Sequence, residues 1–403
     1  MTVSAENARE APQQAGDQRT AGIVACGAHA LHDGYTDLIY LMLPLWQAEF
    51  GLSYAELGIL RGMFSGTMAA FQIPSALVAE RIGAATMLAL GTALAGFGYC
   101  IAGLSGGYAT LLAALFIGGL GASAQHPIAS ALVAHAYAGP SSFKAIGTYN
   151  FAGDLGKMIV PAVLALMLTT LAWRPSLALL GGFGVAVAAA ILLITPRFAP
   201  TTVKPAAAAD ALGSARPKPS RALFWLLLTI AMIDSATRMG FLLFLPFLLT
   251  AKGANLPTIG LALTLVFAGG AAGKLVCAFA GAHMGPVGTI WLTEAVTAAA
   301  VLVLLPLPLI PALILLPAIG VALNGTSSVL YGSVPALVLE DKRTRAFSIF
   351  YTGTIGAGAG APALYGLLGD MFGITAAVVL LALIVLLTLP LAVLIRPHLR
   401  MAA

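Results

Sequence analysis

A stripe of ionisable and polar side chains interrupts the apolar sequence near residue 30. His29, Asp33, Thr36 and Tyr40 recur at i, i+4, i+7 and i+11, the spacing that puts side chains on one face of an α-helix. Imidazole and carboxyl groups readily take up and release protons in proteins. The stripe therefore predicts a site that handles protons or a polar substrate.

Two carboxyl groups lie close together on this helix. Asp33 and Asp37 are one turn apart, and His32 lies at the edge of the same face. In a desolvated cavity, two such carboxyls resist being ionised together. One of them is expected to hold a proton near neutral pH, unless Asp37 or His29 lies near a helix end or pairs statically with a cation.

Two pairs of opposite charge are also expected within apolar helices. Asp234 and Arg238 are spaced i, i+4 in the favourable order for a helical pair, and Asp154 and Lys157 are spaced i, i+3. Each pair is either static or part of gating and substrate contact. Glycines that permit close helix packing surround the second pair: Gly147, Gly153 and Gly156.

Single polar residues complete the candidates for a substrate cavity, with packing as the alternative role for all of them except Lys274. They are His126, Tyr149, Asn150, Lys274, Asn324 and Tyr351. Lys274 is a candidate contact for an anionic substrate, or a partner for Asp33 or Asp154. Glu294 is expected to be structural, and Arg61 is expected to extend its charge to the membrane surface.

The elements that must hold these residues are membrane-spanning helices. Of 403 residues, 60% are apolar and 9% are charged, against about a quarter charged in soluble domains. This composition excludes an ordinary soluble enzyme, and a bilayer span needs about 20 mostly apolar residues. Twelve such spans are predicted, at 22–47, 54–77, 84–104, 108–136, 145–170, 175–195, 222–250, 257–280, 286–306, 311–334, 345–368 and 373–395.

The spans fall into two halves around a Pro- and Ala-rich stretch with five basic residues. The predicted organisation is an N-terminal tail at 1–21, a six-helix bundle at 22–195, a linker at 196–221, a second six-helix bundle at 222–396 and a tail at 397–403. An offset of 202 maps Pro44 onto Pro246, Gly51 onto Gly253, Gly83 onto Gly285 and Tyr149 onto Tyr351. Parallel repeats of this kind are typical of transporters that bind substrate between the halves.

The basic residues predict an orientation in the membrane. With both termini in the cytoplasm, 14 of the 20 Lys and Arg residues lie inside, three lie outside (Arg61, Arg174 and Lys252), and three fall within spans. This asymmetry follows the positive-inside rule. Topology thus accounts for the net charge of +5, which argues against a nucleic-acid partner.

The loop after the second span carries a degraded family motif. It contains Glu80, Arg81 and Gly83, and together with the twelve spans it resembles the major facilitator superfamily, whose loop normally reads G-x-L-A-D-R-x-G-R-K. The first Gly and the terminal basic pair of the motif are missing. The resemblance implies an all-α polytopic membrane protein with twelve transmembrane helices in two pseudo-symmetric six-helix bundles. It also implies that these three residues act in a gating loop.

Three segments resemble the fosmidomycin-resistance-like branch of the superfamily. They are His126-Pro127, the stretch HDGYTDLIYLMLPLWQAEFGLSYAELG and the stretch GTYNFAGDLGK. Leu115 stands about where the drug/proton antiporters of the superfamily carry an Arg, so the chain departs from their coupling scheme.

The expected function is secondary active transport of a small molecule by alternating access, with proton-coupled efflux of a drug or metabolite as the leading direction. Import of an organic acid or other small metabolite by proton symport would need the same residues and is the second possibility. A non-transporting receptor or a channel is the alternative from a different class of function. Motifs for nucleotide binding, metal binding and nucleophilic catalysis are missing from the sequence. We therefore expect no enzyme activity, cofactor or metal. The protein is further expected to be a monomer in the bacterial inner membrane, and its expected partners are substrate, protons and lipid.

Overall fold

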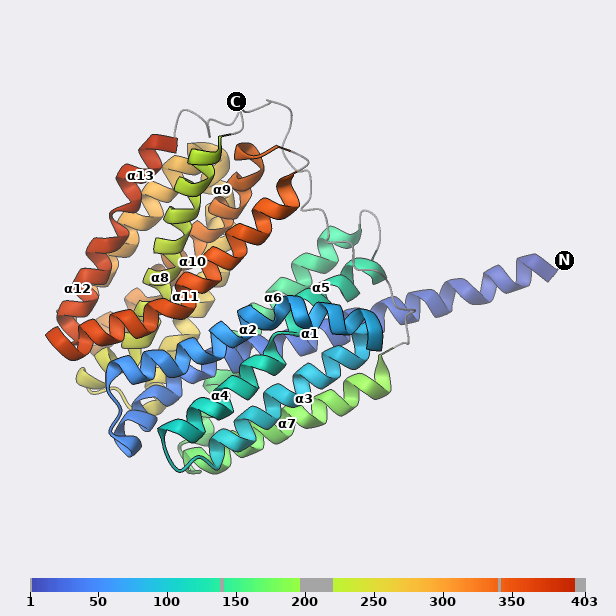
Figure 1. Cartoon of the computed structure of the whole chain (residues 1–403), viewed down its shortest axis with the longest axis horizontal. Coiled ribbons are helices and arrows are strands. Elements are labelled where there is room, and N and C mark those ends of the chain that lie inside the picture. Colours follow the sequence, from blue (N-terminus) through green and yellow to red (C-terminus); the bar gives the residue numbers. More distant parts are fainter. Residues whose placement is uncertain (1, 138–140, 196–219, 340–341, 396–403) are drawn as a thin grey trace. The chain divides into compact units, whose positions relative to one another are not determined.

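The structure is a computed structural model that describes residues 2–137, 141–195, 220–339 and 342–395. Nearly all of the predicted linker, the predicted C-terminal tail and the loop residues Glu340 and Asp341 lie outside this part of the chain. The described elements are all helical (Figure 1). They are α1 (Thr2–Phe50), α2 (Tyr54–Ile82), α3 (Ala84–Gly103), α4 (Tyr108–Ala122), α5 (Gln125–Ala136), α6 (Ser141–Met167), α7 (Trp173–Ile194), α8 (Arg221–Ala251), α9 (Leu256–Leu304), α10 (Leu309–Ser333), the short 3-10 helix η1 (Val334–Leu337), α11 (Arg343–Phe372), α12 (Ile374–Val385) and α13 (Thr388–Ile395).

These helices correspond to the twelve predicted spans, with four differences. Helix α1 continues back to Thr2, the fourth span is divided into α4 and α5, and the last span is divided into α12 and α13. The eighth and ninth spans run together as α9. By length and composition alone, nine stretches of the described chain are long and apolar enough to cross a membrane, which fits a polytopic membrane protein.

The turn inside α9 shows the internal repeat in the backbone. Gly285 has φ 73° and divides α9 into helical stretches at 256–284 and 286–304. Its counterpart Gly83 has φ 91° and separates α2 from α3. A positive φ favours glycine, which lacks a Cβ atom. The bounds of α2 and of the first stretch of α9 differ by 202 at both ends, so the offset found in the sequence recurs in the helices.

The described chain packs as two compact units, whose bounds are Met1–Thr36, Ala70–Val160 and Ala172–Ala208 for the first and Asp37–Ala69, Pro161–Leu171 and Ala209–Ala403 for the second. The division into bundles at 22–195 and 222–396 stays a prediction. The second unit takes in residues 37–69 because α2 packs closely on α11. A Cβ atom at Gly58 would lie 2.2 Å from the carbonyl oxygen of Pro362, and one at Gly62 would lie 2.5 Å from that of Ala359.

One carboxylate of α11 caps the start of α2 within the second unit. Asp370 accepts hydrogen bonds from the backbone N–H groups of Tyr54 and Ala55, at 2.7 and 2.9 Å. The first N–H groups of a helix have no partner within the helix, and a negative charge there is favourable. Asp370 thus stabilises the start of α2.

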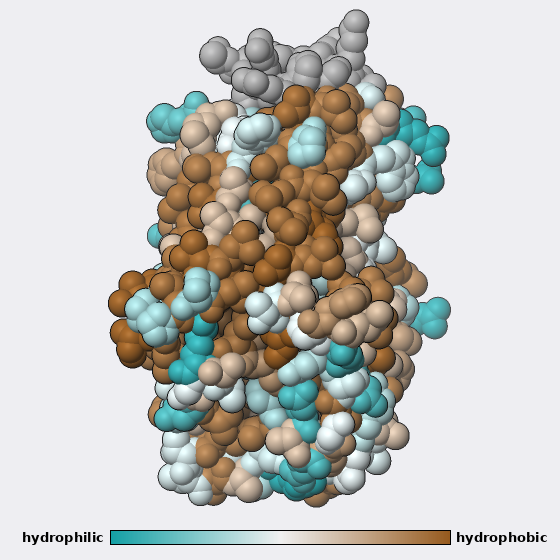
Figure 2. Space-filling view, turned by 90° about the vertical axis from the view of Figure 1, so that its left-hand side faces the viewer, coloured by the Kyte–Doolittle hydropathy of each residue, from teal (hydrophilic) through white to brown (hydrophobic). Residues whose placement is uncertain are grey.

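Large apolar side chains lie on the outside of the protein. Figure 2 shows hydrophobic residues over much of the visible face, and the most exposed examples include Leu104, Leu193 and Ile314, at 83, 85 and 74%. An apolar surface of this kind is unfavourable in water but suits the hydrocarbon of a bilayer.

Candidate functional site

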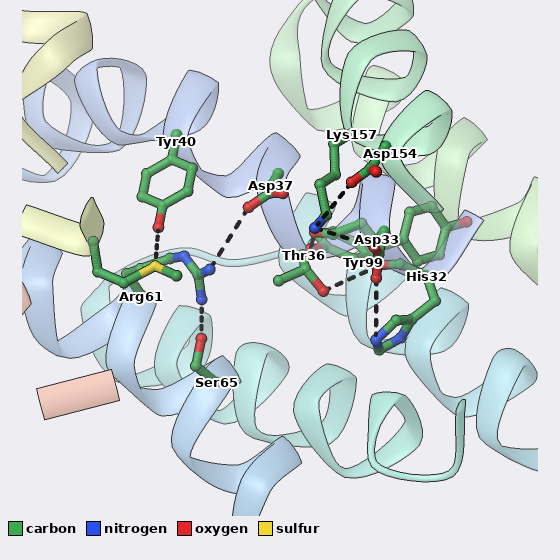
Figure 3. Close-up of polar contacts among 12 residues, drawn as sticks. His32, Asp33, Thr36, Asp37, Tyr40, Arg61, Ser65, Tyr99, Asp154 and Lys157 are labelled. Carbon is green, nitrogen blue, oxygen red and sulfur yellow. Dashed lines mark hydrogen bonds and ion pairs between the residues drawn. The ribbon is translucent and has the colours of Figure 1, made fainter. Parts of the chain in front are cut away.

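The first unit gathers six of the predicted site residues into what we call the histidine–aspartate cluster. Its members are His29, His32 and Asp33 of α1, His126 of α5, and Asp154 and Lys157 of α6. Asp33 is 7% exposed and lies in the middle. Figure 3 shows Lys157 directed between the two carboxylates.

Asp33 makes three charged or potentially charged contacts. Lys157 Nζ lies 3.3 Å from Asp33 Oδ2 and 4.0 Å from Asp154 Oδ1. The other oxygen, Oδ1, lies 3.4 Å from His29 Nε2 and 3.9 Å from His32 Nε2. The sequence paired Lys157 with Asp154, whereas the shorter contact joins it to Asp33 on another helix.

The orientation of the His29 ring leaves one nitrogen for Asp33. His29 Nδ1 lies 2.8 Å from the backbone carbonyl oxygen of Tyr149, which accepts and never donates, so Nδ1 carries the hydrogen. The Tyr149 ring stacks on the imidazole at a centroid distance of 4.0 Å and holds it in place. Nε2 of the neutral ring then turns a lone pair toward the carboxylate, and a proton at Nε2 converts this contact into a charge-assisted hydrogen bond.

Two further imidazoles surround this position. The His126 ring meets His32 edge-on at 4.8 Å and His29 at 5.4 Å. Nε2 of His32 is buried and has no hydrogen-bond partner within the described part of the chain. The cluster therefore places three imidazole rings close to the Asp33 carboxylate.

Glycine on α6 makes room for the cluster. A Cβ atom at Gly153 would lie 2.6 Å from Asp33 Oδ2 and 2.7 Å from His29 Cε1. At Gly156 it would overlap the backbone of α1, 1.8 Å from the carbonyl oxygen of Ala30. A Cβ atom at Gly147 would have nothing within 4 Å, so the expected close packing occurs at two of the three glycines.

The same residues offer ligand atoms for a metal ion. One atom each from His29, Asp33 and His126 lies within 4.8 Å of the others, and imidazole and carboxylate groups suit transition metals. However, the Lys157 ammonium group already supplies a positive charge 3.3 Å from Asp33, and it would repel a divalent cation. The arrangement fits a proton better than a metal.

A second cluster, in the second unit, pairs Asp37 with Arg61, which the sequence analysis expected at the membrane surface. Arg61 Nη2 lies 3.8 Å from Asp37 Oδ1, and the guanidinium lies 4.8 Å from the centre of the Tyr40 ring. Arg61 also donates a hydrogen bond to Ser65 (Figure 3). Arg61 is 3% exposed, so the expectation that it reaches the membrane surface is wrong, because Asp37 and Tyr40 attract it inward.

Replacing Arg61 with Met should destabilise the protein by about 3 kcal/mol or more, because it removes the guanidinium that lies 3.8 Å from the buried Asp37 carboxylate. The double variant Arg61→Met/Asp37→Asn should recover most of that loss. Thermal unfolding in detergent measures both, with Arg81→Met, at an exposed site, as the control expected to change stability by less than about 0.5 kcal/mol. A single variant as stable as the wild type would refute the pairing.

A third cluster joins α8 and α9 of the second unit. Asp234 of α8 contacts Glu294 of α9, and Arg238 interacts with both carboxyls. Glu294 is 1% exposed. The sequence indicated the Asp234–Arg238 pair but set Glu294 aside as structural, because nothing in its own helix showed that it would meet another acid.

The remaining predicted site residues differ in their burial and surroundings. Asn150 is exposed, Lys274 is partly buried, and the Asn324 amide donates to the Gly320 carbonyl of its own helix. Tyr351 is 51% exposed, with its ring 4.6 Å from that of Tyr331. In the predicted gating loop, Glu80 and Arg81 are exposed and Gly83 forms the turn into α3.

Comparison with known families identifies the fold. The family model described as the Major Facilitator Superfamily matches residues 25–327, about three quarters of the chain. The chain belongs to this superfamily. It is therefore a multi-pass membrane protein of a family of secondary transporters for small molecules, and the predicted fold class is confirmed.

Solved structures of superfamily transporters share the fold. A bacterial homologue of the human lysosomal transporter Spinster, in an inward-facing and occupied conformation, matches with a TM-score of 0.78 at 17% identity, over 95% of this chain and 97% of that one. The nucleoside transporter NupG, in a mutant form, matches with a TM-score of 0.76 at 12% identity, over 95% and 100%.

A curated transporter is similar in sequence to part of this chain. The "probable sulfoacetate transporter SauU" of Cupriavidus necator is 27% identical over 146 residues, 36% of this chain. The match spans about a third of the relative's own length, 33%.

Proposed function

We propose that the protein is a proton-coupled secondary transporter that works by alternating access, with the histidine–aspartate cluster as its coupling site. The observation that carries the proposal is the position of buried Asp33 between the Lys157 ammonium and the His29 imidazole, at 3.3 and 3.4 Å. With both aspartates ionised and the imidazoles neutral, Asp33, Asp154 and Lys157 carry a net charge of −1. One proton on an imidazole cancels it, so proton uptake changes the charge that the cluster presents to a substrate.

Efflux in exchange for protons is the direction that we propose. It rests on the resemblance of His126-Pro127 and the stretches 32–58 and 147–157 to the fosmidomycin-resistance-like branch. We further propose a monomer in the bacterial inner membrane that catalyses no reaction, with both termini in the cytoplasm, as the distribution of Lys and Arg favours.

Import of a small organic acid by proton symport is the second candidate. The partial similarity to a sulfoacetate transporter favours it, and Lys157 is a cation that could attract an anionic substrate. The protonated cluster would then bind the acid, and loss of the proton would release it.

The test begins with cells that overproduce the protein and cells that lack it. Their sensitivity to fosmidomycin and other antibiotics, and their growth on sulfoacetate and other organic acids, would select a substrate. That compound would then be used with the purified protein in proteoliposomes, with and without a pH gradient. Accumulation that requires the gradient supports the proposal, and the sign of the gradient separates efflux from import. Flux that ignores the gradient indicates a channel, and the absence of any transported compound indicates a receptor.

A chelator provides the control for the metal alternative. If a transition metal at His29, Asp33 and His126 were needed, EDTA would stop transport. We expect gradient-driven transport to be unchanged by EDTA.

A further inference from the structure

A pair of buried carboxyl groups in the second unit lies outside the cluster proposed for coupling. Asp234 of α8 is 4% exposed and Glu294 of α9 is 1% exposed, and the two side chains lie within hydrogen-bonding reach of each other. Ionised carboxylates accept hydrogen bonds and do not donate them, so a hydrogen bond between two carboxyls needs a proton on one of them. A hydrogen bond between Asp234 and Glu294 therefore requires that one of the two carboxyls binds a proton.

The charges around the pair agree with one bound proton. Arg238, one turn after Asp234, is a cation that interacts with both carboxyls, and Cys277 of α9 and Tyr331 of α10 are further titratable groups near Asp234. Two ionised carboxylates beside one guanidinium would leave a net charge of −1 among buried apolar side chains, which is unfavourable. With one proton the group is neutral.

The surroundings of the Glu294 side chain also favour a protonated carboxyl. Thr326 interacts with its carboxyl group and is itself bonded to Thr293 at 2.7 Å. However, Oε1 of Glu294 is buried without a hydrogen-bond partner within the described residues, and so is the hydroxyl of Thr297 one turn later. An ionised carboxylate with a bare oxygen is far more costly to bury than a neutral carboxyl.

We propose that Asp234 and Glu294 share one proton and form a proton-binding site in the second unit. This goes beyond the proposed function, because the shared proton belongs to the resting protein and needs no substrate or transport.

Infrared spectroscopy of the purified full-length protein tests this at about pH 7.5, where exposed carboxyls, with ordinary pKa values near 4, are ionised. The wild type should show the C=O stretch of a protonated carboxyl, and Glu294→Gln should lose one such band per molecule. The Gln amide can donate to Asp234 as the protonated acid does, so this variant should stay folded. Glu80→Gln, the same change at an exposed site, should leave the spectrum unaltered.

An unchanged protonated-carboxyl band in Glu294→Gln would overturn the proposal. If that variant fails to fold, Asp234→Asn serves instead, and the band should shift or vanish there. An identical band in Asp234→Asn would be equally contrary. Because the measurement involves no transported compound, its failure is distinct from a failure of the proposed function.

Discussion

Replacing Asp33 with Asn should abolish transport driven by a pH gradient while leaving a folded protein. The substitution keeps the size of the side chain but removes the charge that faces Lys157 and His29 at 3.3 and 3.4 Å. A hydrogen bond to a charged group contributes about 1.5–3 kcal/mol, which corresponds to roughly a 10- to 100-fold change in an equilibrium constant. We expect gradient-driven accumulation in proteoliposomes to fall by at least about 10-fold.

Exchange of substrate for substrate provides the internal control for this variant. Counterflow needs no net proton movement, so Asp33→Asn should retain it if Asp33 couples protons. Loss of counterflow as well would indicate that Asp33 holds the substrate or the fold instead. Full accumulation would show that coupling lies elsewhere, and Asp37 would be the next carboxylate to test.

Replacing Gly156 with Leu should prevent recovery of folded protein. A Cβ atom alone at this position would lie 1.8 Å from the carbonyl oxygen of Ala30, and the overlap is with backbone that cannot rotate away. Helices α1 and α6 would have to separate, which would also pull Asp33 away from Lys157. Proteins are stable by only about 5–15 kcal/mol, and forced overpacking of this kind is among the most destabilising changes.

Gly147→Leu is the matched control on the same helix. Gly147 is exposed, and a Cβ atom there would have nothing within 4 Å, while Leu favours helix over Gly by up to about 1 kcal/mol. Size-exclusion chromatography in detergent should show a monodisperse protein for Gly147→Leu and aggregate for Gly156→Leu. Equal behaviour of the two variants would contradict the close packing of α1 on α6.

The sequence was sufficient to predict the helices, the internal repeat and much of one cluster. Twenty-residue apolar runs must be helical in a bilayer because each backbone polar group needs a partner, and the glycine turns repeat at Gly83 and Gly285. The i, i+4 spacing of His29 and Asp33 was enough to place them together. The hydrogen bond from the His29 ring to Tyr149, 120 residues away, also depends on how α6 packs against α1.

The spacing of residues along one helix cannot predict which residues of another helix they contact. Arg61 has no acidic residue three or four positions away in its own helix, so its pairing with Asp37 depends on packing that helical periodicity does not encode. The contact of Glu294 with Asp234 arises in the same way, between α9 and α8. On α6, Tyr149 rather than its neighbour Asn150 faces the cluster, a one-residue difference of about 100° around the helix.

Proton movement accompanying transport is the most direct test of the account. Proteoliposomes would contain a pH-sensitive dye, and the substrate selected by the growth and sensitivity profiles would be added without an imposed gradient. The account predicts a substrate-dependent pH change in the lumen for the wild type and none for Asp33→Asn. Substrate flux in the wild type with no accompanying pH change would contradict proton coupling at the histidine–aspartate cluster.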